Sequence, residues 1–248
     1  MSEQKLPMAG HAHGSAGPDA PKGASTTSLR MIVTLAIFGA VAGAAIVLAY
    51  GWANPRILAN QAARLSASIT EVLGGAERYE TVYLDGGTFT REPQADTAGL
   101  DRVYVGYTAD GQPRGVAIAA NAAGFSDVVR VIFGYDPATG NLLGMKVVEQ
   151  KETPGLGDKV EKDTLFTRQF VGVGTPVLGV KKGRESGAKE EVVMITGATI
   201  SSRVVIDMID RRLEAIGQPV RAFWSSGAAG QGATTQPSGG SGQPGGVR

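Results

Sequence analysis

The longest apolar run of the chain lies near its N-terminus. No charged residue occurs from Met31 to Pro55, and nearly every position from Met31 to Ala53 is apolar or small. A run of this length crosses the hydrocarbon core of a membrane as a helix. A cleaved signal peptide is the alternative, but the polar segment over 1–30 that precedes the run favours an uncleaved anchor. The pattern therefore predicts one transmembrane helix over 31–53.

Beyond Pro55 the apolar positions take a helical spacing. They recur every three or four residues from Ile57 to Leu73 and stop at Gly74-Gly75. This spacing predicts an amphipathic stalk helix over 54–75 that rises from the membrane.

Alternating and apolar runs bounded by turn residues fill the middle of the chain, which is typical of β-strands joined by hairpins. The expected strands are 78–84, 103–108, 115–119, 128–134, 142–149 and 190–195. Helical patterns follow over 162–170 and 202–216. The fold class is therefore α+β: a globular domain over 76–224 with a twisted, largely antiparallel sheet flanked by helices.

The two ends of the chain, 1–30 and 225–248, are rich in small and polar residues and lack apolar periodicity, so disorder is expected there. The 24 basic and 23 acidic residues leave a net charge of +1, which gives no basis for nucleic-acid binding. Cysteine is absent, which excludes disulfides, cysteine-ligated clusters and thiolate catalysis. His11 and His13 have no further ligands near them, so no metal site is expected.

The first motif with chemical potential is 196–202, with the sequence Thr-Gly-Ala-Thr-Ile-Ser-Ser. It joins an expected strand to an expected helix. A helix N-terminus offers unpaired N–H groups and the positive end of the helix dipole, and small residues at Gly197 and Ala198 let a phosphate approach. Simple helix capping by Ser and Thr is the alternative interpretation of this motif.

The second motif is 152–159, with the sequence Glu-Thr-Pro-Gly-Leu-Gly-Asp-Lys, directly after an expected strand. Glycines let the backbone approach a flat ligand, Pro154 stiffens the loop, and Glu152 or Thr153 can hydrogen-bond the edge of a heterocycle. A turn with helix-capping residues is the alternative.

The two motifs in this order resemble the FMN-binding domain family. With the single N-terminal span, the chain from Met31 to Gly217 is similar to the G subunits of Rnf-type electron-transport complexes, whose close relatives are the C subunits of sodium-pumping NADH:quinone oxidoreductases. The resemblance implies that Thr199 carries FMN through a phosphoester. It places residues of the second motif against the ring or its ribityl chain, and residues of the first motif around the phosphate. The former are Glu152, Thr153, Leu156 and Gly157, and the latter are Thr196, Gly197, Ala198 and Ser202. The sequence departs from the family at Val193, where an Asp is usual.

The resemblance also implies a setting for the chain. It indicates an electron-transfer subunit with no catalytic residue of its own, anchored in the inner membrane with its globular domain on the extracytoplasmic side. The implied partners are other membrane and iron–sulfur subunits, a flavin-attaching transferase and membrane lipid. A membrane-tethered regulatory or sensory flavin module, a C-type subunit of the sodium-pumping enzyme, and a purely structural assembly subunit are the alternatives.

Overall fold

The computed structural model describes residues 25–94 and 96–230, and the chain divides at Arg56 into two units. The expected disordered tails lie largely outside these residues, as do His11 and His13. At both boundaries the expectation of disorder was wrong in part. Residues 25–30 are already helical, and Ala229 is buried, with its carbonyl accepting a hydrogen bond from the Tyr107 hydroxyl.

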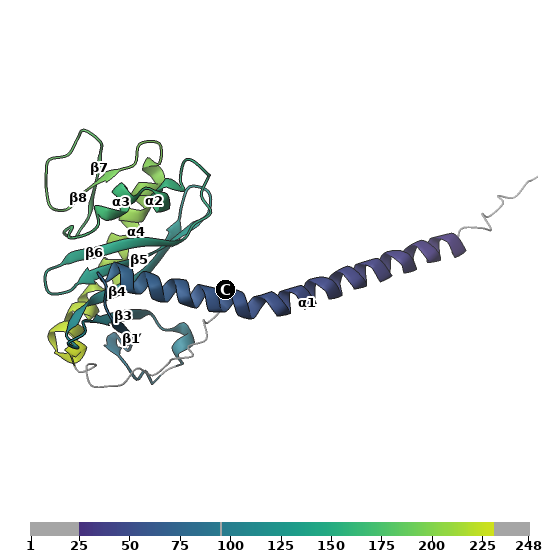
Figure 1. Cartoon of the computed structure of the whole chain (residues 1–248), viewed down its shortest axis with the longest axis horizontal. Helices are drawn as coiled ribbons and strands as arrows, with labels where there is room; N and C mark the ends of the chain where they lie inside the picture. The colour runs from purple at the N-terminus through teal and green to yellow at the C-terminus, as the bar shows by residue number, and fades with distance from the viewer. Residues whose placement is uncertain (1–24, 95, 231–248) are drawn as a thin grey trace, which may run out of the picture. The chain divides into compact units, whose positions relative to one another are not determined.

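Helix α1 (Ser25–Val72) forms one continuous coil of 48 residues (Figure 1). Within the described residues it is the one helix long and apolar enough to cross a membrane. The sequence predicted that Pro55 separates a span from a stalk, but the helix runs through it. A proline inside a helix removes one backbone hydrogen bond, and the bonds on both sides of Pro55 keep the helix continuous.

Six antiparallel strands form the main sheet in the order β2-β1-β3-β4-β5-β6. Their bounds are β1 Arg78–Asp85, β2 Thr88–Thr90, β3 Arg102–Tyr107, β4 Pro113–Ala123, β5 Val128–Asp136 and β6 Asn141–Glu149. A short 3-10 helix, η1 (Thr97–Gly99), precedes β3. The predicted antiparallel sheet is therefore confirmed. Strand β4 extends four residues beyond its predicted end at Ala119, and β2 was not predicted.

One face of the sheet is covered by the last turns of α1. Ile69, Val72 and Leu73 pack against a group of buried sheet residues that includes Tyr104 and Ile132. The close approach depends on glycine in the strands, because a Cβ at Gly134 would collide with the backbone carbonyl of Val72.

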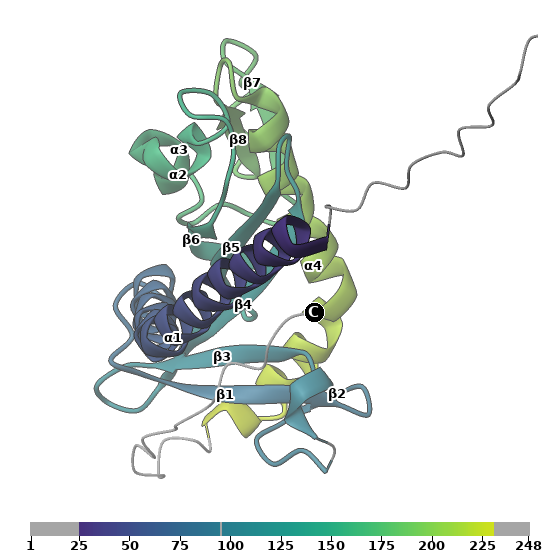
Figure 2. The same cartoon turned by 90° about the vertical axis from the view of Figure 1, so that its right-hand side faces the viewer.

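Helix α4 (Thr199–Ser225) covers the opposite face, where Val205, Ile209 and Ile216 join the main core (Figure 2). It is longer at both ends than the predicted helix over 202–216. Pro219 lies inside it and does not end it. The remaining elements are α2 Lys159–Lys162, α3 Thr164–Arg168 and a parallel pair of strands, β7 Leu178–Lys181 and β8 Glu191–Met194.

Substitution of Gly134 tests the contact between α1 and the sheet. Gly134→Ala places a methyl group where the Val72 carbonyl lies, so the free energy of unfolding should fall by about 1–3 kcal/mol. Urea unfolding of the full-length protein in detergent, followed by near-UV circular dichroism, measures this change. Gly99→Ala is the control, because no atom lies within 4 Å of the added Cβ. Equal stability of the two variants would contradict the packing described here.

Candidate functional site

One buried carboxylate joins three segments at the site. The Glu152 side chain lies in the loop after β6 and is only 5% exposed. Its Oε1 accepts hydrogen bonds from the backbone N–H groups of Ser126 at 3.0 Å and Asp127 at 3.4 Å, and its Oε2 accepts one from the Ser201 hydroxyl at 3.1 Å. This arrangement, called here the Glu152 bracket, links the β4–β5 loop, the β6–α2 loop and the first turn of α4.

Two glycines leave room for the Glu152 bracket. A Cβ at Gly124 or at Gly157 would collide with a carboxylate oxygen of Glu152. Gly157 therefore has a structural reason to be glycine that is independent of any ligand. The hydroxyls of Thr153 and Ser126 lie 3.0 Å apart and add a second link between the same two loops.

Each segment of the Glu152 bracket presents one large apolar side chain to solvent. Phe125 is 68% exposed, Leu156 52% and Ile200 59%. Exposed apolar side chains on three neighbouring segments are suited to contact a flat organic ligand.

The first turn of α4 has no side-chain cap. Its N-cap residue is Ala198, which has no polar side-chain atom. The nearby hydroxyls bind elsewhere: Ser202 Oγ donates to the Ala198 carbonyl at 2.9 Å and accepts from the Ile195 N–H at 3.1 Å, while Ser201 donates to Glu152. In the part of the chain that the structure describes, the N–H groups of Thr199, Ile200 and Ser201 have no acceptor. The interpretation of this motif as simple Ser/Thr capping is therefore wrong.

A cation and a nucleophilic oxygen lie beside these N–H groups. Thr199 is partly exposed, and its Oγ1 makes one long hydrogen bond of 3.4 Å to the Ile195 carbonyl. Gly197 has a φ of +86°, and the Lys159 Nζ lies 4.0 Å from the position of a Cβ on Gly197. Lys159 forms no ion pair with the described residues. Three N–H groups without an acceptor among the described residues and one ammonium group near Gly197 thus lie at this end of α4, which suits an anion.

Asp158 supports the backbone that carries Lys159. Its Oδ2 pairs with the Lys162 Nζ at 2.7 Å, and this hydrogen bond lowers the pKa of the Asp158 carboxyl below its ordinary value. Its other oxygen, Oδ1, is buried and has no partner among the described residues. The charged pair spans α2, from its N-cap residue to its last residue.

The structure also shows the surroundings of Val193. The amide of Gln169 holds its backbone, accepting from the N–H at 2.7 Å and donating to the carbonyl at 3.2 Å. The carboxylate of Glu191, two residues before Val193, accepts hydrogen bonds from Ser186 and Gly187 in the preceding loop. Glu191, one of the two acids nearest to Val193 in the sequence, is therefore already bonded within its own loop.

The predicted site residues come together at the Glu152 bracket and the adjoining first turn of α4. The exposed ones are Thr153, Leu156, Thr196 and Gly197, the buried ones are Glu152, Gly157, Ala198 and Ser202, and Thr199 is intermediate. Sequence reasoning did not assign roles to Ser126, Ser201 or Lys159, because their contacts form only in the fold. No group of three or more acidic, His or Cys residues in the described chain is arranged to hold a metal.

Comparison with known proteins identifies the family. The model of the FMN-binding domain matches residues 124–214, which include the Glu152 bracket and most of α4. The G subunit of the ion-translocating oxidoreductase complex of Pectobacterium atrosepticum is 30% identical over 190 residues, which cover 75% of this chain and 88% of that protein. The chain belongs to this G-subunit family.

A further relative agrees with the family assignment, and a solved structure shows the same fold. The G subunit of the corresponding complex of Methanosarcina acetivorans is 28% identical over 180 residues, or 73% of this chain and 89% of that protein. The crystal structure of Shewanella oneidensis NqrC has the same fold, with a TM-score of 0.51 and 20% identity over 67% of this chain and 93% of that chain.

Removal of the Glu152 carboxylate tests the bracket. Glu152→Ala deletes three hydrogen bonds to a charged group, so the flavin-free protein should lose about 2–3 kcal/mol of unfolding free energy. The control is Glu149→Ala, which breaks an exposed ion pair with Arg130 and should cost at most about 1 kcal/mol. Urea titration measures both. A loss in Glu152→Ala no larger than in the control would contradict the structural role.

The pair of Asp158 and Lys162 gives a pH-dependent contribution to stability. Because the pKa of Asp158 is lowered in the folded state, its contribution is fully present above the ordinary carboxyl pKa and is lost as the pH falls through the folded value. The stability difference between wild type and Asp158→Asn should therefore shrink in acid. Repeating the comparison in a Lys162→Met background should remove most of this pH dependence. An unchanged dependence would show that the pairing of Asp158 with Lys162 is not its cause.

Proposed function

We propose that this chain is a membrane-anchored flavoprotein subunit that carries FMN on Thr199 and relays electrons within an Rnf-type ion-translocating oxidoreductase complex. The FMN-binding domain and the G-subunit relatives support the cofactor and the complex. The uncapped N-terminus of α4 is the observation that supports Thr199 as the point of attachment.

The residues around Thr199 fit a phosphate group. An anion there accepts hydrogen bonds from the N–H groups of Thr199, Ile200 and Ser201, which otherwise have no acceptor in the described chain. The Lys159 ammonium supplies the opposite charge, and the open surface at Gly197 removes steric hindrance. A 27-residue helix adds the positive end of its dipole to the same place.

Covalent attachment uses the Thr199 hydroxyl once. The Oγ1 atom forms a bond to the phosphorus of an activated flavin phosphoanhydride, the anhydride P–O bond breaks, the leaving group keeps the bridging oxygen, and the hydroxyl proton passes to solvent. A flavin-attaching transferase supplies this donor. The single long hydrogen bond of Thr199 Oγ1 leaves its lone pairs available for the new bond.

The loop over 153–157 covers the chain that leads away from the phosphate. We infer that Thr153 and Leu156, which are exposed on this loop, contact the ribityl chain, while Glu152 and Gly157 fix the loop. When bound, FMN supplies one- and two-electron transfer, and the protein sets its position and surroundings.

The membrane helix determines where this chemistry takes place. We assign α1 as a single-pass anchor in the inner membrane, with the globular domain on the extracytoplasmic side, because three basic residues precede the span and two follow it. The former are Lys5, Lys22 and Arg30, and the latter are Arg56 and Arg64. At its other end the Arg56 guanidinium lies 4.2 Å from the centroid of the Trp52 ring, a pair suited to the membrane interface. A tethered flavin here exchanges electrons with membrane and iron–sulfur subunits of the complex.

In-gel flavin fluorescence tests the attachment. The full-length protein, produced together with the flavin-attaching transferase, should give a fluorescent band that survives denaturation. Thr199→Ala should be dark, and Thr167→Ala, which removes an exposed helical hydroxyl elsewhere, should remain bright.

Substitution of Lys159 tests, in the same experiment, whether its positive charge promotes flavin attachment. Lys159→Met should reduce the fraction of flavin-bearing protein severalfold, because the cation beside the phosphate is lost. Lys151→Met removes an exposed cation from the same loop and should have no such effect. A bright Thr199→Ala band would refute the attachment site, and equal loading of both lysine variants would refute the role of Lys159.

A further inference from the structure

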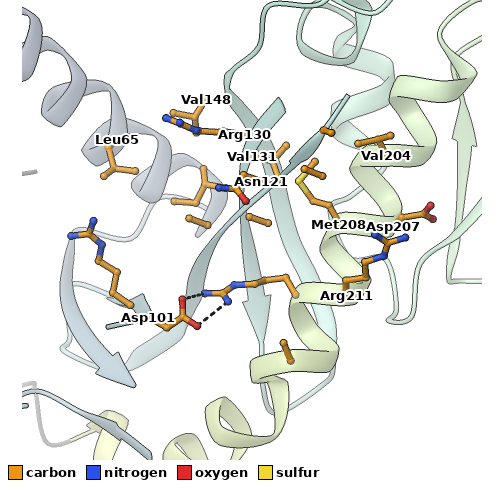
Figure 3. A pocket seen from close by; sticks show the side chains of 18 of the residues that line it. Leu65, Asp101, Asn121, Arg130, Val131, Val148, Val204, Asp207, Met208 and Arg211 are labelled. Atoms are coloured by element: carbon orange, nitrogen blue, oxygen red, sulfur yellow. Dashed lines mark hydrogen bonds and ion pairs between the residues drawn. The ribbon is translucent and has the colours of Figure 1, made fainter. Parts of the chain in front are cut away.

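A cleft of about 780 Å³ opens between the last turns of α1, strand β4 and helix α4 (Figure 3). Leu65 lies on the α1 side, Val204 and Met208 lie on the α4 side, and Asn121 lies between them. None of the residues proposed to hold FMN lines this cleft. The cleft is therefore separate from the flavin site.

The cleft contains the place of a missing strand. The pairing of β3 with β4 ends where Val103 faces Ile118, whereas β4 continues to Ala123. Residues 119–123 of β4 therefore pair only with β5. Five residues of a strand span about 17 Å. We call the gap beside residues 119–123 the β4 slot.

Two residues of β4 direct their backbone groups into the β4 slot. The Gly124 N–H donates to the Asp127 carbonyl at 2.8 Å and closes the turn between β4 and β5. Because bonded and non-bonded residues alternate in an antiparallel pair, the next bonds to β5 fall at Ala122 and at every second residue before it. The N–H and C=O groups of Asn121 and Ala123 then face the slot, where they have no partner among the described residues. An edge of this kind can accept an added strand.

The side chains around the β4 slot leave this edge open and provide apolar contacts on both faces of the sheet. Four of the five residues over 119–123 are alanine. Leu65 and Tyr104 belong to the apolar group under α1, and Val204 and Met208 belong to the core under α4. A strand in the slot would therefore bury side chains on both of its faces.

The charge of the β4 slot is positive. Four arginines and two aspartates line the cleft. Two of the arginines form ion pairs, Arg212 with Asp101 and Arg130 with Glu149. The lining residues that form no ion pair with any described residue are Arg102, Arg211 and Asp207. The two arginines lie on β3 and on α4 and are both exposed, so a segment with acidic side chains is favoured.

We propose that the β4 slot binds an extended, acidic segment of a partner protein, which adds to β4 as a further strand. The C-terminal residues 231–248 of the chain itself do not fit this description, because they include no acidic residue and one arginine. The slot ends at Ala123, next to Gly124, where an added Cβ would collide with the Glu152 carboxylate. The bound strand therefore brings the partner close to the Glu152 bracket.

Proline substitution at the edge tests strand addition. A fluorescently labelled short peptide of alternating valine and glutamate is the probe, and its binding to the full-length protein in detergent is followed by fluorescence anisotropy. Asn121→Pro removes an N–H group that faces the slot and leaves the bonds to β5 in place, so it should weaken binding about tenfold. Asn121→Ala removes the same side chain but keeps the N–H group, and it should bind the peptide as the wild type does.

Hydrogen–deuterium exchange of the wild type locates the bound peptide without any substitution. The peptide should slow exchange over residues 119–123 severalfold, because the N–H groups of Asn121 and Ala123 then donate to it. Exchange over residues 108–112, in the turn between β3 and β4, should stay unchanged.

Charge reversal tests the preference for acidic segments. Arg211→Glu should weaken binding of the glutamate peptide severalfold and strengthen binding of a matched peptide of alternating valine and lysine. Arg184→Glu reverses an exposed charge in the loop after β7 and should change neither affinity.

These measurements use protein produced without the flavin-attaching transferase, so their outcome does not depend on the proposed function. Failure of the wild type to bind the glutamate peptide would overturn the inference, as would equal binding by Asn121→Pro and Asn121→Ala. Weaker binding to Arg211→Glu without protection of residues 119–123 would mean that the cleft attracts anions and adds no strand, which also overturns it.

Discussion

The site depends on the charge of one buried side chain. The Glu152 carboxylate accepts hydrogen bonds from two backbone N–H groups and one hydroxyl. None of the three donors lies in the same loop as Glu152. A carboxylate that loses contact with water must be compensated in this way. Its three bonds fix the first turn of α4 against the ends of β4 and β6. The same carboxylate is the reason for the glycines at 124 and 157.

With α4 held by the Glu152 bracket and by its packing on the sheet, the helix does not need a side-chain cap. An N-cap hydroxyl or carboxylate usually stabilises a helix by about 1 kcal/mol. Here the N-cap residue is Ala198, and the hydroxyls of Ser201 and Ser202 bind other groups. The first N–H groups of α4 therefore have no acceptor in the part of the chain that the structure describes, and the Lys159 ammonium lies near Gly197, just before this helix.

Local patterns were sufficient for most of the sheet. The alternation over β5 and β6 and the turn between them predicted a hairpin that the structure contains. Proline was a poor guide to helix ends, because α1 continues through Pro55 and α4 through Pro219. Strand β7 was missed since glycine and proline interrupt the pattern around it.

The Glu152 bracket depends on tertiary structure, and for that reason no local pattern indicated it. Residues 119–123 of β4 have no partner on the β3 side because β4 extends beyond the start of β3, a mismatch in length between two strands that hydrophobic periodicity does not reveal. Glu152 was expected to contact a ligand, whereas its carboxylate oxygens bind Ser126, Asp127 and Ser201. The proximity of Lys159 to Gly197 likewise joins residues from two separate motifs.

Peptide mass spectrometry of the purified full-length protein tests the central claim, covalent FMN on Thr199, most directly. Trypsin releases residues 190–203 as one peptide, which contains four hydroxyl side chains, at Thr196, Thr199, Ser201 and Ser202. The account predicts that this peptide gains the mass of FMN less one water and that its fragment ions place the added mass on Thr199. An unmodified peptide from flavin-bearing protein, or added mass on another hydroxyl, would contradict it.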